Sequence, residues 1–268
     1  MHSFPQTVSL FIPCLVDQVY PEIGLAMANV LRRAGVRVEY DARQTCCGQP
    51  AFNAGYRNEA LQVAQHFLEM FADKPALVTP SGSCAAMVRK FYAHLFAEHP
   101  RRDEALALGP RVFEFSEFMV HQLQRIAVGA TYSRKVGFHN SCHSYRELGI
   151  GAEPLALLRE VQGLELIELP GEPVCCGFGG LFSVKFAPIA SAMTNSRLEA
   201  FEKLGVETIV SNDPGCIMQM RKEAFARGMK LEILHLAEVL SQVGGGIEST
   251  KGSTQSCMSR CFGGAHLN

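Results

Sequence analysis

The sequence predicts an α/β protein made of two homologous cysteine-rich domains related by internal duplication, each a mostly parallel sheet with helices. An adjacent cysteine pair followed by glycine occurs twice, at Cys46-Cys47-Gly48 and at Cys175-Cys176-Gly177, and the flanking cysteines repeat at offsets of 128 to 132 residues. Within each half, short apolar runs alternate with segments of helical period, which is typical of an α/β layer. A repeat of this length indicates two copies of a domain rather than a solenoid of short units.

In the first half, three short apolar runs are expected to be buried strands: VSLFIP at 8–13, VRVEYD at 36–41 and ALVTP at 76–80. Helical patterns lie between and after them, near 21–34, 56–72 and 84–97. Residues 98–111 contain Pro100 and Pro110 with mixed charge, so we expect a linker or long loop there.

In the second half, the expected strands are KVGFHN at 135–140, LELIEL at 164–169, TIVSND at 208–213 and LEILHL at 231–236. The expected helices lie near 153–162, 184–204, 216–227 and 236–243. The stretch near 128–135 is expected to join the halves, which gives predicted domains at 1–127 and 128–243. Residues 244–268 are rich in Gly, Ser and Thr and are predicted to be a disordered tail, in which Cys257 and Cys261 are free thiols.

The composition favours a globular protein with a sizeable core. Apolar residues make up 47% of the 268 residues, and charged residues make up 19%. The net charge is −1, so the chain lacks the excess of basic residues that attracts nucleic acid or an anionic membrane surface. No run of 18 apolar residues and no signal peptide is visible, so a cytoplasmic location is expected. Reducing conditions there keep thiols free, which favours metal ligation over disulfides for the ten cysteines.

Eight cysteines form two sets of four with the same wide spacing. Because the outer members of each set follow predicted parallel strands, we expect each set to converge at one sheet edge. Soft thiolates at such a site suit iron–sulfur or zinc, and the wide spacing favours iron–sulfur, with zinc in one half left open. Gly48 and Gly177 allow backbone N–H groups to approach the sulfurs. The expected ligands are Cys14, Cys46, Cys47, Cys84, Cys142, Cys175, Cys176 and Cys216.

Four further residues lie near the second set of cysteines. His139 and His143 flank Cys142; we expect His139 to be a satisfied structural residue, whereas His143 is an open choice between a ligand and a hydrogen-bonding neighbour. Lys185 and Arg197 could offset the charge of a cluster, but a solvated helix face is the expected place for both.

These motifs resemble the CCG cysteine-rich domain family, which includes the CCG-containing component of heterodisulfide reductase and the iron–sulfur subunit of glycolate oxidase. The segments QTCCGQPAFNAGY, PSGSCAAMVR, HNSCHSYRELG, CCGFGGLFSVK, DPGCIMQM and HLAEVL are most similar to its short, stand-alone lactate utilisation A members, over about residues 7 to 243. The resemblance implies a cytoplasmic iron–sulfur subunit of a complex that oxidises L-lactate to pyruvate by electron transfer. It also implies partners of the lactate utilisation B type, a ferredoxin-like iron–sulfur protein, and of the C type.

The chain also departs from the family pattern. Ser81 and Asp213 stand where the resemblance would place a fifth cysteine in each half, so an ordinary 4Fe–4S cluster with four thiolates, or with an oxygen ligand, is the simpler expectation, one or two per chain. No ferredoxin-type cysteine run is present, so we expect an oxidoreductase subunit rather than a complete enzyme. A thiol/disulfide redox subunit like heterodisulfide reductase, and a metal-stapled scaffold without a redox role, remain alternatives.

The two halves are not expected to be equivalent. The GFGG run at 177–180 offers more backbone donors than the GQP at 48–50, and two histidines flank Cys142. Donors stabilise the reduced form of a cluster, so the second set is predicted to be the more redox-active one.

Overall fold

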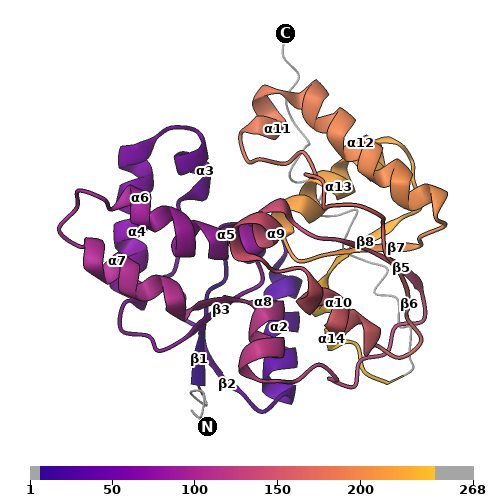
Figure 1. Cartoon of the computed structure of the whole chain (residues 1–268), viewed down its shortest axis with the longest axis horizontal. Helices are drawn as coiled ribbons and strands as arrows, with labels where there is room; N and C mark the ends of the chain where they lie inside the picture. Colours follow the sequence, from indigo (N-terminus) through magenta and orange to yellow (C-terminus); the bar gives the residue numbers. More distant parts are fainter. Residues whose placement is uncertain (1–6, 245–268) are drawn as a thin grey trace.

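The computed structural model describes residues 7–244 and contains two four-stranded sheets (Figure 1). Every strand pair in both sheets is parallel. The order β2-β1-β3-β4 in the first sheet is repeated as β6-β5-β7-β8 in the second. This repetition confirms the predicted α/β fold with an internal duplication. The predicted tail after Gly244, with Cys257 and Cys261, lies outside the described residues.

The strands are short, and all but one overlap a predicted apolar run. The first sheet consists of β1 (Thr7–Leu10), β2 (Arg37–Glu39), β3 (Leu77–Thr79) and β4 (Val112–Glu114). The second consists of β5 (Lys135–His139), β6 (Glu165–Ile167), β7 (Thr208–Ser211) and β8 (Glu232–His235). The strand β4 was not predicted, because its residues VFE include a glutamate and do not belong to an apolar run like those of the other strands.

The helices lie between the strands, as expected for parallel crossovers. Those of the first half are α1 (Cys14–Gln18), α2 (Pro21–Arg33), α3 (Gln49–Asn53), α4 (Arg57–Phe71), α5 (Gly82–Ala86), η1 (Met87–Phe91), α6 (Tyr92–Leu95), α7 (Arg102–Leu108), η2 (Gly109–Arg111), α8 (Phe115–Glu117) and η3 (Phe118–Gln122). Those of the second half are α9 (Cys142–Leu148), α10 (Ala152–Arg159), α11 (Phe182–Lys185), α12 (Ala187–Lys203), α13 (Pro214–Ala226) and α14 (Leu236–Ser241). No helix in residues 7–244 is long and apolar enough to cross a membrane.

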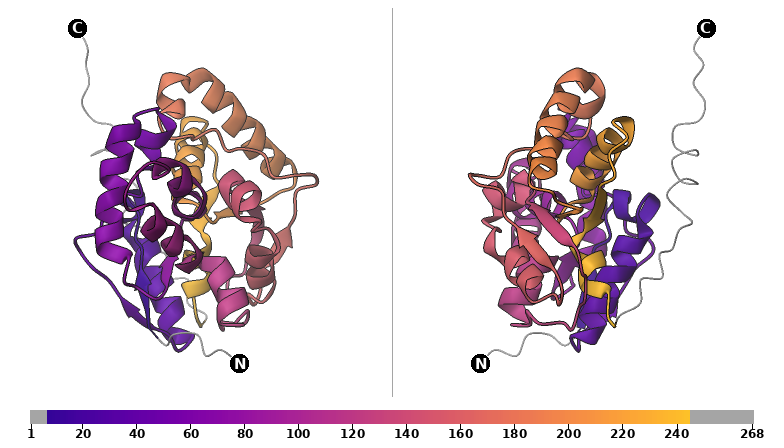
Figure 2. Two further views of the ribbon diagram at one scale, coloured as in Figure 1. Left: turned by 60° about the vertical axis from the view of Figure 1, so that its left-hand side comes forward. Right: turned by 90° about the vertical axis from the view of Figure 1, so that its right-hand side faces the viewer.

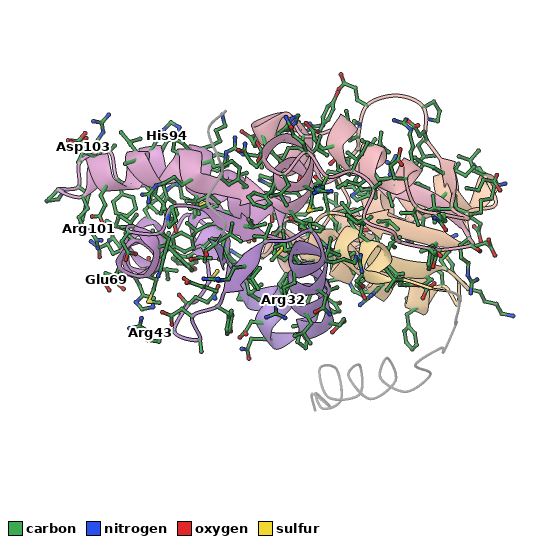
Figure 3. The ribbon with its side chains drawn as sticks, turned by 90° about the horizontal axis from the view of Figure 1, so that it is seen from below. Arg32, Arg43, Glu69, His94, Arg101 and Asp103 are labelled. Atoms are coloured by element: carbon green, nitrogen blue, oxygen red, sulfur yellow. The ribbon has the colours of Figure 1, made fainter. Side chains whose placement is uncertain are left out.

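The prediction of a linker at 98–111 is wrong, because the segment contains α7 and η2. Its residues DEALAL are mostly strong helix formers, and Pro110 lies in the first turn of η2, where proline is tolerated. Arg101 precedes α7 and bonds Glu104, and it also lies 3.7 Å from Glu69 on α4. Arg101, Glu69 and Asp103 lie together at the outer side of the first half (Figure 3).

Alternating residues of the first sheet face two different cores. Val8 and Leu10 of β1 and Val78 of β3 belong to a core that continues into the second half. Leu77 and Val112 face a second core, together with the aromatic residues of α4, η1 and α6. The first sheet is therefore covered on both faces, as parallel sheets usually are.

Each half packs a helix near its C-terminal end against a helix of the other half. α14 packs against α2 of the first half, and α8 packs against α10 of the second (Figures 1 and 2). In addition, α5 packs against α9. The predicted boundary between residues 127 and 128 lies in the irregular segment between η3 and β5. It stays a prediction, since one core spans both sides of it.

Candidate metal centres

Each half brings its four cysteines to the carboxyl ends of its strands. The first cysteine begins the short helix after the central strand: Cys14 in α1 and Cys142 in α9. The last lies in the helix after the next strand of the sheet: Cys84 in α5 and Cys216 in α13. The adjacent pairs lie in the loops after β2 and β6. Because parallel strands end at a common edge, residues far apart in sequence meet there.

In the first half, the thiols form a chain of contacts. Cys14 Sγ lies 3.7 Å from Cys46 Sγ, and the backbone N–H of Gly48 donates to Cys46 Sγ over 3.3 Å. The thiols of Cys14 and Cys47 also bond Cys46, which lowers its pKa to about 3. Cys47 is buried and its thiol bonds Cys46 and Cys84, which raises its pKa. The arrangement favours a thiolate at Cys46.

The second half repeats this pattern. The thiols of Cys142 and Cys176 bond Cys175 and, with the N–H of Gly177 at 3.4 Å, lower the pKa of Cys175 to about 2. Cys176 Sγ lies 3.0 Å from Cys216 Sγ, and both residues are buried. The first cysteine of each pair is therefore the favoured thiolate in both halves, and its partner points inward.

The glycine after each pair is required by its backbone. Gly48 and Gly177 have φ of +85° and +88°, a conformation that side chains rarely adopt. A Cβ on Gly48 would lie 3.1 Å from the carbonyl oxygen of Ala60, and one on Gly177 only 2.5 Å from that of Ala190. Each glycine thus lets the loop lie against a helix while its N–H reaches a sulfur.

A buried aspartate joins the two centres. Asp213 Oδ2 accepts hydrogen bonds from the Ser81 hydroxyl at 3.1 Å and from the Ser83 N–H at 2.9 Å. Its Oδ1 caps α13 by accepting from Gly215 N–H at 3.0 Å, while Ser81 Oγ caps α5 by accepting from Cys84 N–H. The positions where the family resemblance would place extra cysteines are therefore bonded to each other across the two halves. The sequence signal for this was their equivalent place in the repeat.

The four residues set beside the second centre have different surroundings. His143 Nδ1 lies 3.7 Å from Cys142 Sγ, and its ring contacts Phe91 of the first half. Lys185 is exposed, as expected. Arg197 is not solvated as expected, because its Nε–H donates to His139 Nδ1 at 3.2 Å.

The expectation of a satisfied, structural His139 is also wrong. Its side chain is fully buried, and its Nε2 has no hydrogen-bond partner within residues 7–244. A ring nitrogen of His139 and the Sγ atoms of Cys176 and Cys216 all lie within 4.8 Å of one another. Burial lowers the pKa of His139 to about 3, and the charge of Arg197 adds to the effect. Sequence order could not reveal this contact, because Arg197 lies 58 residues away.

The donor set fits a soft metal or an iron–sulfur cluster. All eight described cysteines are free thiols, and each set combines buried sulfurs with backbone N–H donors. Thiolate donors select zinc and iron–sulfur over hard cations.

Comparison with known proteins agrees with the repeat. The cysteine-rich domain CCG matches residues 8–89 and again 136–221. This chain belongs to the CCG cysteine-rich domain family. Lactate utilization protein A from Bacillus subtilis is 41% identical to it over 87% of this chain and 98% of that protein. Lactate utilization protein A from Geobacillus kaustophilus has the same identity and coverage. A glutamate racemase from Bacillus anthracis covers 88% of this CCG protein and 79% of its own chain, at 16% identity and a TM-score of 0.34, which is too remote to bear on function.

Proposed function

We propose that this CCG protein is a cytoplasmic iron–sulfur subunit that transfers electrons in a complex oxidising L-lactate to pyruvate. The observation that carries the proposal is the repeated set of four converging thiols. It occurs in a chain that is 41% identical, over nearly its whole described length, to proteins named for lactate utilization. The free thiols suit a reducing compartment.

The eight cysteines would hold two clusters of the 4Fe–4S type, one in each half. Such a cluster supplies one-electron transfer. In each half, the favoured thiolate would offer negative charge to iron, and the neighbouring thiols would lose their protons when they bind it. The N–H of Gly48 or Gly177 donates to the first sulfur of the pair. Burial of Cys47, Cys84, Cys176 and Cys216 keeps water from the inner side of each centre.

The overall reaction defines what the partners must do. L-lactate gives pyruvate with the release of two electrons and two protons. The protons pass to solvent, and the electrons leave one at a time to a ferredoxin-like iron–sulfur protein of the lactate utilization B type. A protein of the C type completes the complex. This chain contains no ferredoxin-type cysteine run, which supports the need for a separate carrier.

Anaerobic purification tests the cofactor and co-purification tests the function. Iron and sulfide analysis should give about one cluster per half, with broad absorption near roughly 400 nm from thiolate-ligated iron. Lactate-dependent reduction of the B-type protein should require the chain, and Cys176→Ser should abolish it, whereas Cys257→Ser, outside the two sets, should not.

The same measurements separate the alternatives. Zinc without iron would contradict the electron-transfer role and support a metal-stapled scaffold. An EPR signal that appears on adding a disulfide, without a response to lactate, would instead support a thiol/disulfide redox subunit.

A further inference from the structure

The two halves differ at one buried pair of residues. Phe11 and His139 each lie three residues before the first cysteine of their set. Phe67 and Arg197 each lie seven residues after the alanine whose carbonyl oxygen faces Gly48 or Gly177. The second half therefore has His139 and Arg197 where the first half has Phe11 and Phe67.

The contacts within the two pairs follow from their chemistry. The rings of Phe11 and Phe67 are buried and meet edge to face, with centroids 4.7 Å apart. In the second half, Arg197 donates to His139 and its guanidinium lies 4.9 Å from the ring centre of Phe201. Among the residues that the structure describes, no carboxylate pairs with Arg197. The first centre thus has an apolar wall where the second has a polar and positively charged one.

Arg197 selects the tautomer of His139. An arginine N–H can only donate, so His139 Nδ1 must be the acceptor and the imidazole proton must lie on Nε2. A protonated Nε2 cannot be a metal ligand. It is a donor, and in residues 7–244 it has no partner although it is buried. Buried polar groups in native proteins almost always find one.

Sulfur atoms lie close to the imidazole ring of His139. A ring nitrogen of His139 lies within 4.8 Å of both Cys176 Sγ and Cys216 Sγ. The thiolate sulfurs, or the sulfides of a cluster that these cysteines would ligate, accept hydrogen bonds and would gain negative charge on reduction.

We propose that His139, positioned by Arg197, donates its Nε2–H to a sulfur of the second centre and makes that centre easier to reduce than the first. The inference rests on the proposed function, because it takes both sets of cysteines to hold iron–sulfur clusters. Electrons that enter the protein would then reduce the second centre first. The first centre, beside Phe11 and Phe67, would have the lower reduction potential.

The test is His139→Phe, which copies the residue of the first half. EPR-monitored redox titration should show the reduction equilibrium constant of the second centre falling about tenfold or more, which for one electron is about 59 mV. The potential of the first centre and the iron content should not change. His139→Gln keeps an N–H donor and should restore part of the shift, and Phe11→Leu is the matched control for repacking. Loss of the signal in Cys175→Ser identifies the second centre.

Two outcomes would overturn the proposal. An unchanged potential in His139→Phe would exclude the hydrogen bond. Loss of iron from the second centre in both His139→Phe and His139→Gln would make His139 a ligand or a packing residue.

If the wild-type protein binds only zinc, the proposed function fails, but the donor can still be tested. In zinc-loaded, diamagnetic protein, nitrogen-15 NMR should then show the His139 proton on Nε2. A proton on Nδ1 would refute the proposed donor.

Discussion

Removing the carboxylate of Asp213 should weaken the contact between the two halves and lower the free energy of unfolding. Asp213 is 3% exposed and accepts from Ser81 and Ser83 of the first half while capping α13 of the second. Asp213→Ala removes both acceptor oxygens and with them all three hydrogen bonds.

The contacts give the size of the effect. The N–H of Ser83 loses its acceptor in a partly buried place, at a cost of about 1–3 kcal/mol. Loss of the cap on Gly215 costs about 1–2 kcal/mol more. The Ser81 hydroxyl can turn to Ser83 Oγ, 3.3 Å away, so it adds little. The free energy of unfolding should therefore fall by about 2–5 kcal/mol.

Urea unfolding of the anaerobically purified protein, followed by circular dichroism, measures this loss. Asp213→Asn keeps one acceptor oxygen and should lose less, and the exposed Asp73→Ala is the matched control. If the halves separate, the single transition should also split into two. Equal stability of Asp213→Ala and Asp73→Ala, at the same metal content, would refute the reasoning.

Three other predictions concern the glycines, a buried histidine and the cysteine pairs. Gly177→Ala should lower the melting temperature and the iron content more than Gly48→Ala, because its Cβ meets a backbone oxygen at 2.5 Å rather than 3.1 Å; equal losses would contradict this. The imidazole of buried His235 lies near Arg221 and donates its Nε2–H to the Pro80 carbonyl, while the backbone N–H of His235 donates to Glu238; its pKa is lowered to about 3 mainly by burial. As the pH falls, the unfolded state binds a proton at this histidine before the folded state does. The free energy of unfolding should therefore drop by about 1.5–2 kcal/mol from pH 6.5 to pH 5. His235→Gln should flatten that slope in urea titrations at several pH values. Cys175→Ser should abolish lactate-dependent electron transfer while Cys46→Ser reduces it less, and equal sensitivity would argue against a more active second centre.

Some elements could be predicted from sequence and others could not. Four long helices were predicted with ends that differ from the observed ones by only a few residues, because each is long enough to show a helical pattern. They are α2, α4, α12 and α13. The short α9 is too brief to show a helical period, and β4 contains Glu114 instead of a continuous apolar run. The helix α7 was obscured by the prolines on either side.

The sequence by itself determined the duplication, the parallel α/β architecture and the placing of cysteines after strands, because repeat order and apolar period are properties of the chain alone. Only the tertiary structure decided which distant residues meet: Asp213 with Ser81, 132 positions apart, and Arg197 with His139. It also decided that α8 and α14 each pack on the other half. These contacts depend on how the two complete sheets and their helices pack together. A local pattern along the chain does not show which distant side chains this packing brings into contact.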